Sequence, residues 1–200
     1  MSIVSPKKLF TLSALFVGMF SVSAFAADPT PPKAVTVNGG TVHFTGSIVD
    51  AACAVDNGSD GETVKLGQFR AADLATAGKE SGKVPFTIKL TDCDLGGDTK
   101  TAPYSKVAVT FSGDTASGNT KALAVKPASS GASDEAASNV GVEILQAGKA
   151  LALDGSALAT ASSLSKGDNE LKFNAAYIAT ADKATAGEAN ADVTFKLTYE

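Results

Sequence analysis

Residue types that support catalysis or metal binding are sparse in this 200-residue chain. It holds one histidine, His43, and two cysteines, Cys53 and Cys93. A single imidazole cannot build a histidine metal site, and His43 falls on the polar side of an alternating stretch, where an ordinary exposed residue is expected. The Gly-x-Ser-x-Gly pattern of a hydrolase nucleophile does not occur, and neither do phosphate-binding or dinucleotide-binding glycine patterns. The sequence therefore predicts no enzyme, no cofactor and no metal site.

Two acidic stretches partly match the pattern of a calcium-binding loop. Residues 92–98 place carboxylates at the first, third and seventh positions, but the twelfth position, which needs a bidentate glutamate, is Pro103. Residues 56–61 place glycine at the third position and Gly67 at the twelfth. Both stretches are interpreted as turns. Asn57-Gly-Ser59 matches the N-glycosylation triplet, and a turn is a sufficient explanation for it.

The N-terminal 26 residues are typical of a secretory signal peptide. Lys7 and Lys8 precede a short apolar run over residues 9–20, and small residues follow before Ala26. The run is too short for a transmembrane helix, which needs about 20 apolar residues. Cleavage is expected after Ala26, with Ala27 as the alternative. The protein is therefore predicted to be exported, with no membrane insertion of the mature chain.

The exported part of the chain is acidic and carries one pair of cysteines. Without Lys7 and Lys8 it has 15 basic and 21 acidic residues, a net charge of −6, and a single arginine, Arg70. Nucleic acid is not expected as a partner, because phosphate binding needs clustered positive charge. In an oxidising compartment, Cys53 and Cys93 are expected to form a structural disulfide; two free buried thiols are the alternative. Closing a loop of about 40 residues would stabilise the fold by roughly 4 kcal/mol.

Alternation of apolar and polar residues predicts β-strands along most of the exported chain. The expected strands are residues 63–69, 83–93, 107–111, 122–125, 140–145, 151–153, 171–178 and 192–200. A helical turn is expected within residues 71–77, and no segment has the pattern of a long amphipathic helix. Many short strands separated by turn residues indicate a single all-β sandwich.

Alternating stretches near the two ends of the chain predict the function. Residues 192–200 form the final expected strand, with no expected strand after it; its apolar face carries Val193, Phe195, Leu197 and Tyr199. Residues 41–48 alternate in the same way and follow a proline-containing leader, residues 27–38, which is expected to be extended and flexible. The apolar side of this second stretch carries Val42, Phe44, Gly46 and Ile48.

A sandwich that lacks one strand leaves an open groove with unpaired backbone groups. An extended segment of another molecule can fill such a groove, with main-chain hydrogen bonds and alternate side chains supplying the contacts. If every chain carries one groove and one donor segment, the contact is head-to-tail and does not close, so it produces a filament.

Several stretches along the exported chain match one known family. They are residues 37–46 (Val-Asn-Gly-Gly-Thr-Val-His-Phe-Thr-Gly), 51–55 (Ala-Ala-Cys-Ala-Val), 64–68, 86–93 and 140–145, with the penultimate Tyr199 and Gly187 at the fourteenth place from the end. On these residues the sequence resembles the major pilins of chaperone–usher fimbriae, the shaft subunits of type 1-like fimbriae of Gram-negative bacteria. Together these features are specific, whereas any one alone would be weak.

The resemblance implies an incomplete immunoglobulin-like sandwich of six strands plus an N-terminal donor-strand extension. The chain would comprise a signal peptide (residues 1–26), the extension (residues 27–48) and a pilin domain (residues 49–200). The Cys53–Cys93 disulfide would form in the periplasm. The leader is longer than in similar type 1 subunits, which leaves the start of the donor segment open.

The resemblance also implies the partners: neighbouring copies of the chain, a periplasmic pilus chaperone and an outer-membrane usher. The acceptor groove and chaperone-binding site would comprise Val193, Phe195, Leu197, Tyr199, Glu200 and Gly187, with the carboxylate of Glu200 held by chaperone cations. The donor strand would insert Val42, Phe44, Gly46 and Ile48, and Gly46 would occupy a position where a larger side chain fits poorly.

The expected function is structural: polymerisation by donor-strand exchange into the pilus rod at the cell surface, in support of adhesion. The alternative is a minor tip or adaptor pilin of the same system. A tip adhesin is disfavoured because it would carry a further binding domain, and a secreted hydrolase would need a catalytic site that these residues do not provide. The donor segment could also fold into the groove of its own chain.

Overall fold

The computed structural model describes residues 33–44, 46–56, 61–96, 104–128 and 135–200. It divides into two compact units, Met1–His43 and Phe44–Glu200, which are described separately. In the described part of the second unit, six strands are six residues or longer: β2 (Val84–Cys93), β3 (Lys106–Gly113), β5 (Asn119–Ala124), β6 (Val140–Gln146), β9 (Gly167–Ala179) and β10 (Val193–Tyr199). The remaining elements are short: β1 (Ala54–Val55), β4 (Thr115–Ala116), β7 (Lys149–Ala150), β8 (Ser162–Ser163) and the 3-10 helix η1 (Ala71–Leu74).

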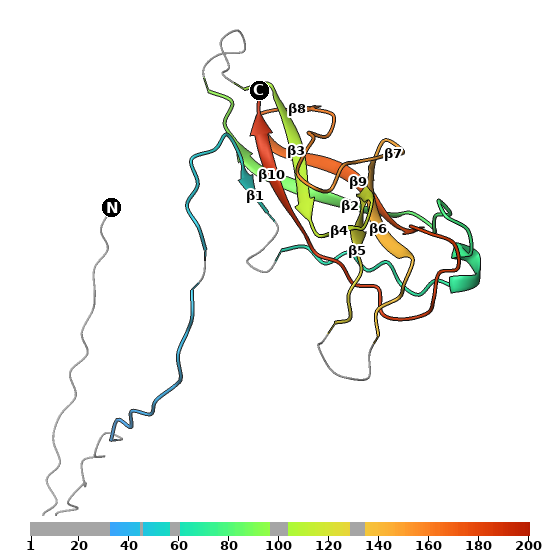
Figure 1. Cartoon of the computed structure of the whole chain (residues 1–200). Coiled ribbons are helices and arrows are strands. Elements are labelled where there is room, and N and C mark those ends of the chain that lie inside the picture. The colour runs from blue at the N-terminus through green and yellow to red at the C-terminus, as the bar shows by residue number, and fades with distance from the viewer. Residues whose placement is uncertain (1–32, 45, 57–60, 97–103, 129–134) are drawn as a thin grey trace, which may run out of the picture. The chain divides into compact units, whose positions relative to one another are not determined.

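These strands form two antiparallel sheets (Figure 1). The larger has the order β1-β2-β9-β6-β5-β4, with β7 paired to β6, and the smaller has the order β10-β3-β8. β3 belongs to the smaller sheet, and β4, which follows it directly in the chain, belongs to the larger sheet. Two sheets enclosing one core confirm the predicted all-β sandwich of immunoglobulin type.

The long central strands form because their side chains alternate between a core face and a solvent face. β2 and β9 pair from Val84↔Ala175 to Leu90↔Asn169, and the register then shifts before Cys93↔Gly167. At this irregularity Asp92 has a φ of 51°, a left-handed backbone conformation that aspartate tolerates better than most residues. The bend brings Cys93 to its disulfide partner at the edge of the sheet.

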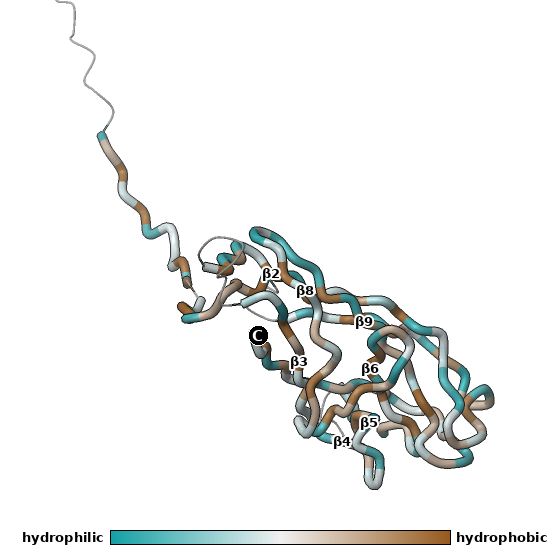
Figure 2. Tube along the Cα trace, turned by 90° about the horizontal axis from the view of Figure 1, so that it is seen from above, coloured by the Kyte–Doolittle hydropathy of each residue, from teal (hydrophilic) through white to brown (hydrophobic). Residues whose placement is uncertain are grey.

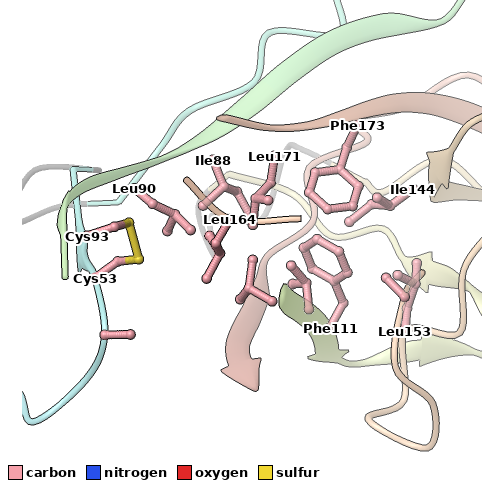
Figure 3. Close-up of a cluster of buried hydrophobic side chains, with 14 of the residues drawn as sticks. Cys53, Ile88, Leu90, Cys93, Phe111, Ile144, Leu153, Leu164, Leu171 and Phe173 are labelled. Atoms are coloured by element: carbon pink, nitrogen blue, oxygen red, sulfur yellow. A yellow bond between two sulfur atoms is a disulfide. The ribbon is translucent and has the colours of Figure 1, made fainter. Parts of the chain in front are cut away.

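The core lies between the two sheets and is centred on aromatic side chains (Figure 3). Phe173 of β9 is 1% exposed and meets Phe111 of β3 edge-on, with ring centroids 5.2 Å apart. Phe86 of β2 stacks on Phe173, with ring centroids 5.6 Å apart. Aromatic pairs at these separations contribute about 1 kcal/mol each beyond area burial. The Phe86–Phe173 pair lies within the larger sheet, and the Phe111–Phe173 pair joins the two sheets.

The predicted disulfide is present between Cys53 and Cys93, which are 40 residues apart and both buried. The alternative of two free thiols is therefore wrong. Cys53 lies immediately before β1, whose residues pair with Thr91 and Leu90 of β2. The disulfide thus fixes the segment before β1 to one of the long strands of the larger sheet.

Two predicted strands are absent from the described structure. Residues 63–69 belong to no strand, although their side chains alternate: Val64 and Leu66 are half-buried, while Thr63 and Lys65 are exposed. A strand requires a hydrogen-bonded neighbour, and this segment has none in the described part of the chain. Residues 151–153 are also outside any strand; the ladder of β6 with β7 ends at Ala150, and only the Leu151 N–H continues it, to the Ile144 carbonyl.

The described part of the first unit, residues 33–43, is extended and exposed, with no strand or helix. Apolar residues recur along it and include Val35, Val37 and Val42, which are 73–82% exposed (Figure 2). No helix in the described ranges is long and apolar enough to cross a membrane. The predicted signal peptide lies outside the described residues.

Candidate functional site: an open groove beside β10

One wall of the groove is the edge strand β10, which in the described chain pairs with β3 alone. The pairing is regular from Val193↔Gly113 to Tyr199↔Val107, and the Thr194 hydroxyl donates a further hydrogen bond to the Ser112 carbonyl at 2.8 Å. The inward residues Val193, Phe195, Leu197 and Tyr199 are all half-buried, and the residues between them are exposed. An apolar face that stays half-buried on a well-formed strand indicates that its covering layer is incomplete.

The opposite wall is the segment 61–67, which is bounded by Gly61 and Gly67 with φ of 75° and 78°. These left-handed conformations are accessible to glycine without strain. Between the two glycines, Val64 and Leu66 are half-buried and line the cavity, and Leu66 packs against the core. The segment has the alternation of a strand but not the pairing, and it faces β10 across the groove.

The floor of the groove consists of apolar side chains from both sheets, and the cavity between the walls has a volume of about 670 Å³. The floor residues are Phe86, Ile88, Phe111, Leu123, Val142, Ile144, Ala175 and Tyr177. Most of them belong to the main core cluster shown in part in Figure 3. The groove therefore opens onto the hydrophobic core and is not a shallow surface depression.

One end of the groove is formed by residues 189–192 and is fixed by polar contacts. Main-chain hydrogen bonds join Lys126 and Asn190 in both directions, at 2.8 and 3.1 Å. The Lys126 ammonium lies 2.5 Å from the Asp192 carboxylate, and this hydrogen bond and charge raise the pKa of Lys126. The Tyr177 hydroxyl donates to the Ala189 carbonyl at 3.2 Å. These contacts join the segment that leads into β10 to Lys126 and Tyr177.

At the other end, Tyr199 connects β10 to the disulfide. Its hydroxyl donates to the Cys53 carbonyl at 3.4 Å, and its ring meets Tyr104 edge-on at 5.9 Å. Burial raises the pKa of Tyr199, and the Cys53 hydrogen bond opposes this shift. The main-chain oxygen of Glu200 accepts hydrogen bonds from the N–H groups of Ser105 and Lys106, so main-chain pairing continues one residue beyond β10.

The structure brings together only part of the predicted acceptor site. Val193 and Phe195 line the cavity, whereas Leu197 and Tyr199 continue the same face of β10 along the core. Gly187 lies outside the cavity lining. Its position against residues 135–137 is so close that a Cβ there would stand 2.4 Å from the Ala137 nitrogen.

The opposite wall and the fixed end of the groove are not predictable from the sequence. The alternation of Val64 and Leu66 predicted a strand, but nothing in the sequence indicated that this strand would face β10 across an open space. The contacts of Lys126 with Asn190 and Asp192 bridge more than 60 positions and leave no local sequence signal.

The predicted donor residues are among the most exposed apolar residues of the chain. Val42, in the first unit, is 73% exposed; Phe44 and Ile48, in the second, are 92% and 101% exposed. Gly46 has nothing within 4 Å of the place where a Cβ would stand. No described residue of 33–50 lies in a strand.

The described part of the 92–98 acidic stretch contains a local side-chain-to-backbone contact. The Asp94 carboxylate accepts a hydrogen bond from the Gly96 N–H at 3.2 Å. Residues 57–60 and 97–103 lie outside the described part of the chain, and with them the Asn57 triplet and Asp98. Across the described ranges, no group of three or more histidine, cysteine or acidic side chains is placed to hold a metal ion.

A two-sheet immunoglobulin-like sandwich with an open groove in place of a strand defines the class of chaperone–usher pilus subunits. A solved structure of a chaperone–usher pilus matches this chain with a TM-score of 0.66 and 26% identity, covering 84% of this chain and all of the other. The P pilus rod subunit PapA shares the fold, with a TM-score of 0.61 at 24% identity over 75% of this chain and all of that one.

The chain belongs to the fimbrial protein family, whose model matches residues 42–200. It is 46% identical over 195 residues to the type-1 fimbrial protein, A chain, of Escherichia coli K12, covering 96% of this chain and all of the relative. It is also 46% identical over 198 residues to the fimbrial subunit type 1 of Klebsiella pneumoniae, with the same coverage. The chain is a structural fimbrial subunit and not an enzyme.

Proposed function

We propose that this subunit polymerises head-to-tail by donor-strand exchange and forms the rod of a type 1-like fimbria on the bacterial surface. Residues 27–48 are the donor extension, and the β10 groove of the next copy is the acceptor. The observation that carries the proposal is a groove that opens onto the hydrophobic core, in a chain that also has an exposed, alternating apolar segment.

The donor and the groove agree in spacing. Alternate residues on a strand lie about 6.8 Å apart. Val42, Phe44, Gly46 and Ile48 therefore span about the same length as the four inward residues of β10. The unpaired edge of β10 and the unpaired segment 61–67 both have main-chain groups available for a strand inserted between them. Insertion would complete the smaller sheet and cover the half-buried face of β10.

Exposed core and an unpaired edge would make an isolated subunit prone to aggregation. We therefore infer that a periplasmic chaperone first occupies the groove and that an outer-membrane usher exchanges it for the donor segment of the next copy. The chaperone site comprises Val193, Phe195, Leu197 and Tyr199 with the carboxylate of Glu200. Gly187 contributes indirectly, since its close packing against residues 135–137 sets the path of the chain toward β10.

A truncation tests the donor role. A chain without residues 27–47 is expected to be recovered with its chaperone but to be unable to cap another subunit. A synthetic peptide of residues 39–50 should restore a folded subunit. In the control peptide, Phe44 is exchanged with Thr45 and Ile48 with Ser47. This control peptide should not restore folding. Efficient polymerisation of the truncated chain would contradict donor-strand exchange.

Subunit counting separates the rod from the alternative of a tip or adaptor subunit. In purified fibres a rod subunit is present in large excess over every other component, whereas a tip or adaptor subunit is present in one or a few copies. A stable monomer would instead indicate that the donor segment occupies its own groove.

A further inference from the structure

Glu143 is a charged residue that this fold buries. It lies in the middle of β6, only 1% exposed, and it is the sole charged side chain in the buried set of the described residues. Its Oε1 atom has no hydrogen-bond partner among the described residues. A buried carboxylate without a partner is costly, and such a group commonly takes up a proton instead of remaining ionised. The groove and the donor contacts make no use of this residue.

The alternation of β6 places Glu143 on the side of the sheet opposite the core. Its neighbours Val142 and Ile144 join the core cluster, so the intervening side chain points to the other face. Glu143 pairs with Ala176 of β9, which is fully buried and small. The segment before β2 borders the other edge of β9, with Glu80 bridged to Ile178. Because Ala176 is small, side chains from that segment can reach across β9 toward Glu143.

Two charged groups act on the Glu143 carboxyl, Glu80 and Lys83, and they form an ion pair with each other at 3.0 Å. Both are partly exposed, at 37% and 40%. The other neighbouring strands supply uncharged residues: β9 supplies Ala176 and Ile178, and β5 ends at Ala122–Ala124. On β7, Lys149 is exposed and pairs with Gln146 at the far end of β6.

Burial is the main cause that raises the pKa of Glu143, to about 7. The nearby charge of Glu80 raises it further, and Lys83 opposes the shift. The direction follows from the geometry: a desolvated carboxyl lies beside a second carboxyl, and the nearby cation is already paired with that second carboxyl.

We propose that Glu143 takes up a proton when the chain folds, so that the folded pilin domain is more stable in mildly acidic than in mildly alkaline solution. In the unfolded chain the carboxyl ionises near its ordinary pKa of 4.5. Between that value and about 7, the folded state binds more protons than the unfolded state. The stabilisation that this group contributes is therefore fully present below pH 4.5 and is lost as the pH rises through about 7. The unfolding equilibrium constant changes by up to about tenfold per pH unit in this window. The inference applies to the folded domain whether or not it polymerises.

Infrared spectroscopy of the full mature chain, in the assembly state in which it is isolated, tests the proposal directly. The wild-type protein is expected to show a protonated carboxyl band that titrates near neutral pH, and Glu143→Gln should remove it. Unfolding midpoints of both proteins, measured from pH 5 to pH 8.5 at one protein concentration, should converge at the acidic end. The wild type should lose stability relative to Glu143→Gln as pH rises. A pH-independent difference, or no band lost in the variant, would overturn the proposal.

Two variants of the exposed neighbours keep the test decisive if Glu143→Gln fails to fold. Lys83→Gln removes the opposing cation and should move the titration to higher pH. Glu80→Gln removes the second negative charge and should move it to lower pH. Shifts in these opposite directions support the cluster as described. Unchanged titration in both variants would overturn it.

Discussion

Phe195 is the residue of β10 through which the groove is most directly tested. It is half-buried, lines the cavity and lies 6.4 Å from Phe111, measured between ring centroids. Replacing a fully buried phenylalanine by alanine costs about 3–5 kcal/mol. Because Phe195 is only partly buried, we expect Phe195→Ala to reduce the binding free energy of an inserted strand by about 2 kcal/mol. This corresponds to a roughly 30-fold lower affinity.

Lys196→Ala is the matched control for Phe195→Ala. Lys196 is the next residue of the same strand, keeps the same pairing with β3, and points to solvent. Fibres of each variant would be exposed to increasing guanidinium, and the released subunits would be separated from intact polymer and quantified. Phe195→Ala fibres should dissociate at clearly lower denaturant than wild type, and Lys196→Ala fibres at nearly the wild-type concentration. If Phe195→Ala prevents assembly, Phe195→Leu should give the intermediate case. Equal effects of Phe195→Ala and Lys196→Ala, or none from either, would refute the assignment of β10 as a groove wall.

Three further predictions follow from the same structure. Replacing Cys53 and Cys93 together by serine should cost about 4 kcal/mol of folding free energy, measured by denaturant unfolding, and an unchanged midpoint would show that the 40-residue loop is already ordered in the unfolded chain. Gly187→Ala should lower the yield of folded subunit, because the added Cβ would lie 2.4–2.7 Å from the backbone of residues 135–137. Gly82→Ala is the control and should leave the yield unchanged, since nothing lies within 4 Å of its Cβ position. Equal yields of the two variants would count against the close packing at Gly187. Tyr199→Phe should destabilise the domain by about 1 kcal/mol through loss of the hydrogen bond to Cys53, with Tyr199→Ala costing more in the same thermal unfolding assay; an equal cost for both would show that the ring contributes nothing.

The fold was predictable from the sequence because each long strand carries its own period-two pattern. β2, β3, β6, β9 and β10 all lie where the alternation predicts them. The four two-residue strands were not predicted, because so short a ladder depends on a distant neighbour and not on local pattern. The 3-10 helix η1 falls within the predicted helical turn.

The site was predictable only along β10. The alternation of residues 63–69 suggested an ordinary strand, but the structure leaves that segment unpaired across an open groove. The local alternation predicts which side chains point toward the core. It does not predict whether a neighbouring strand is present to pair with the segment. Glu143 was also missed as a buried group, since a single polar residue in an apolar strand normally marks the solvent face, and its burial arises from residues about 60 positions away.

The most direct test of donor-strand exchange is a crosslink from the donor segment into the groove of another copy. A photoreactive amino acid at Ile48 would be activated in fibres assembled from mixed isotopically light and heavy subunits, and the crosslinked peptides would be identified by mass spectrometry. We predict crosslinks that join light and heavy chains, from position 48 to residues 61–67 or 189–195. Crosslinks confined to a single chain, or joined to surfaces outside the groove, would contradict the account.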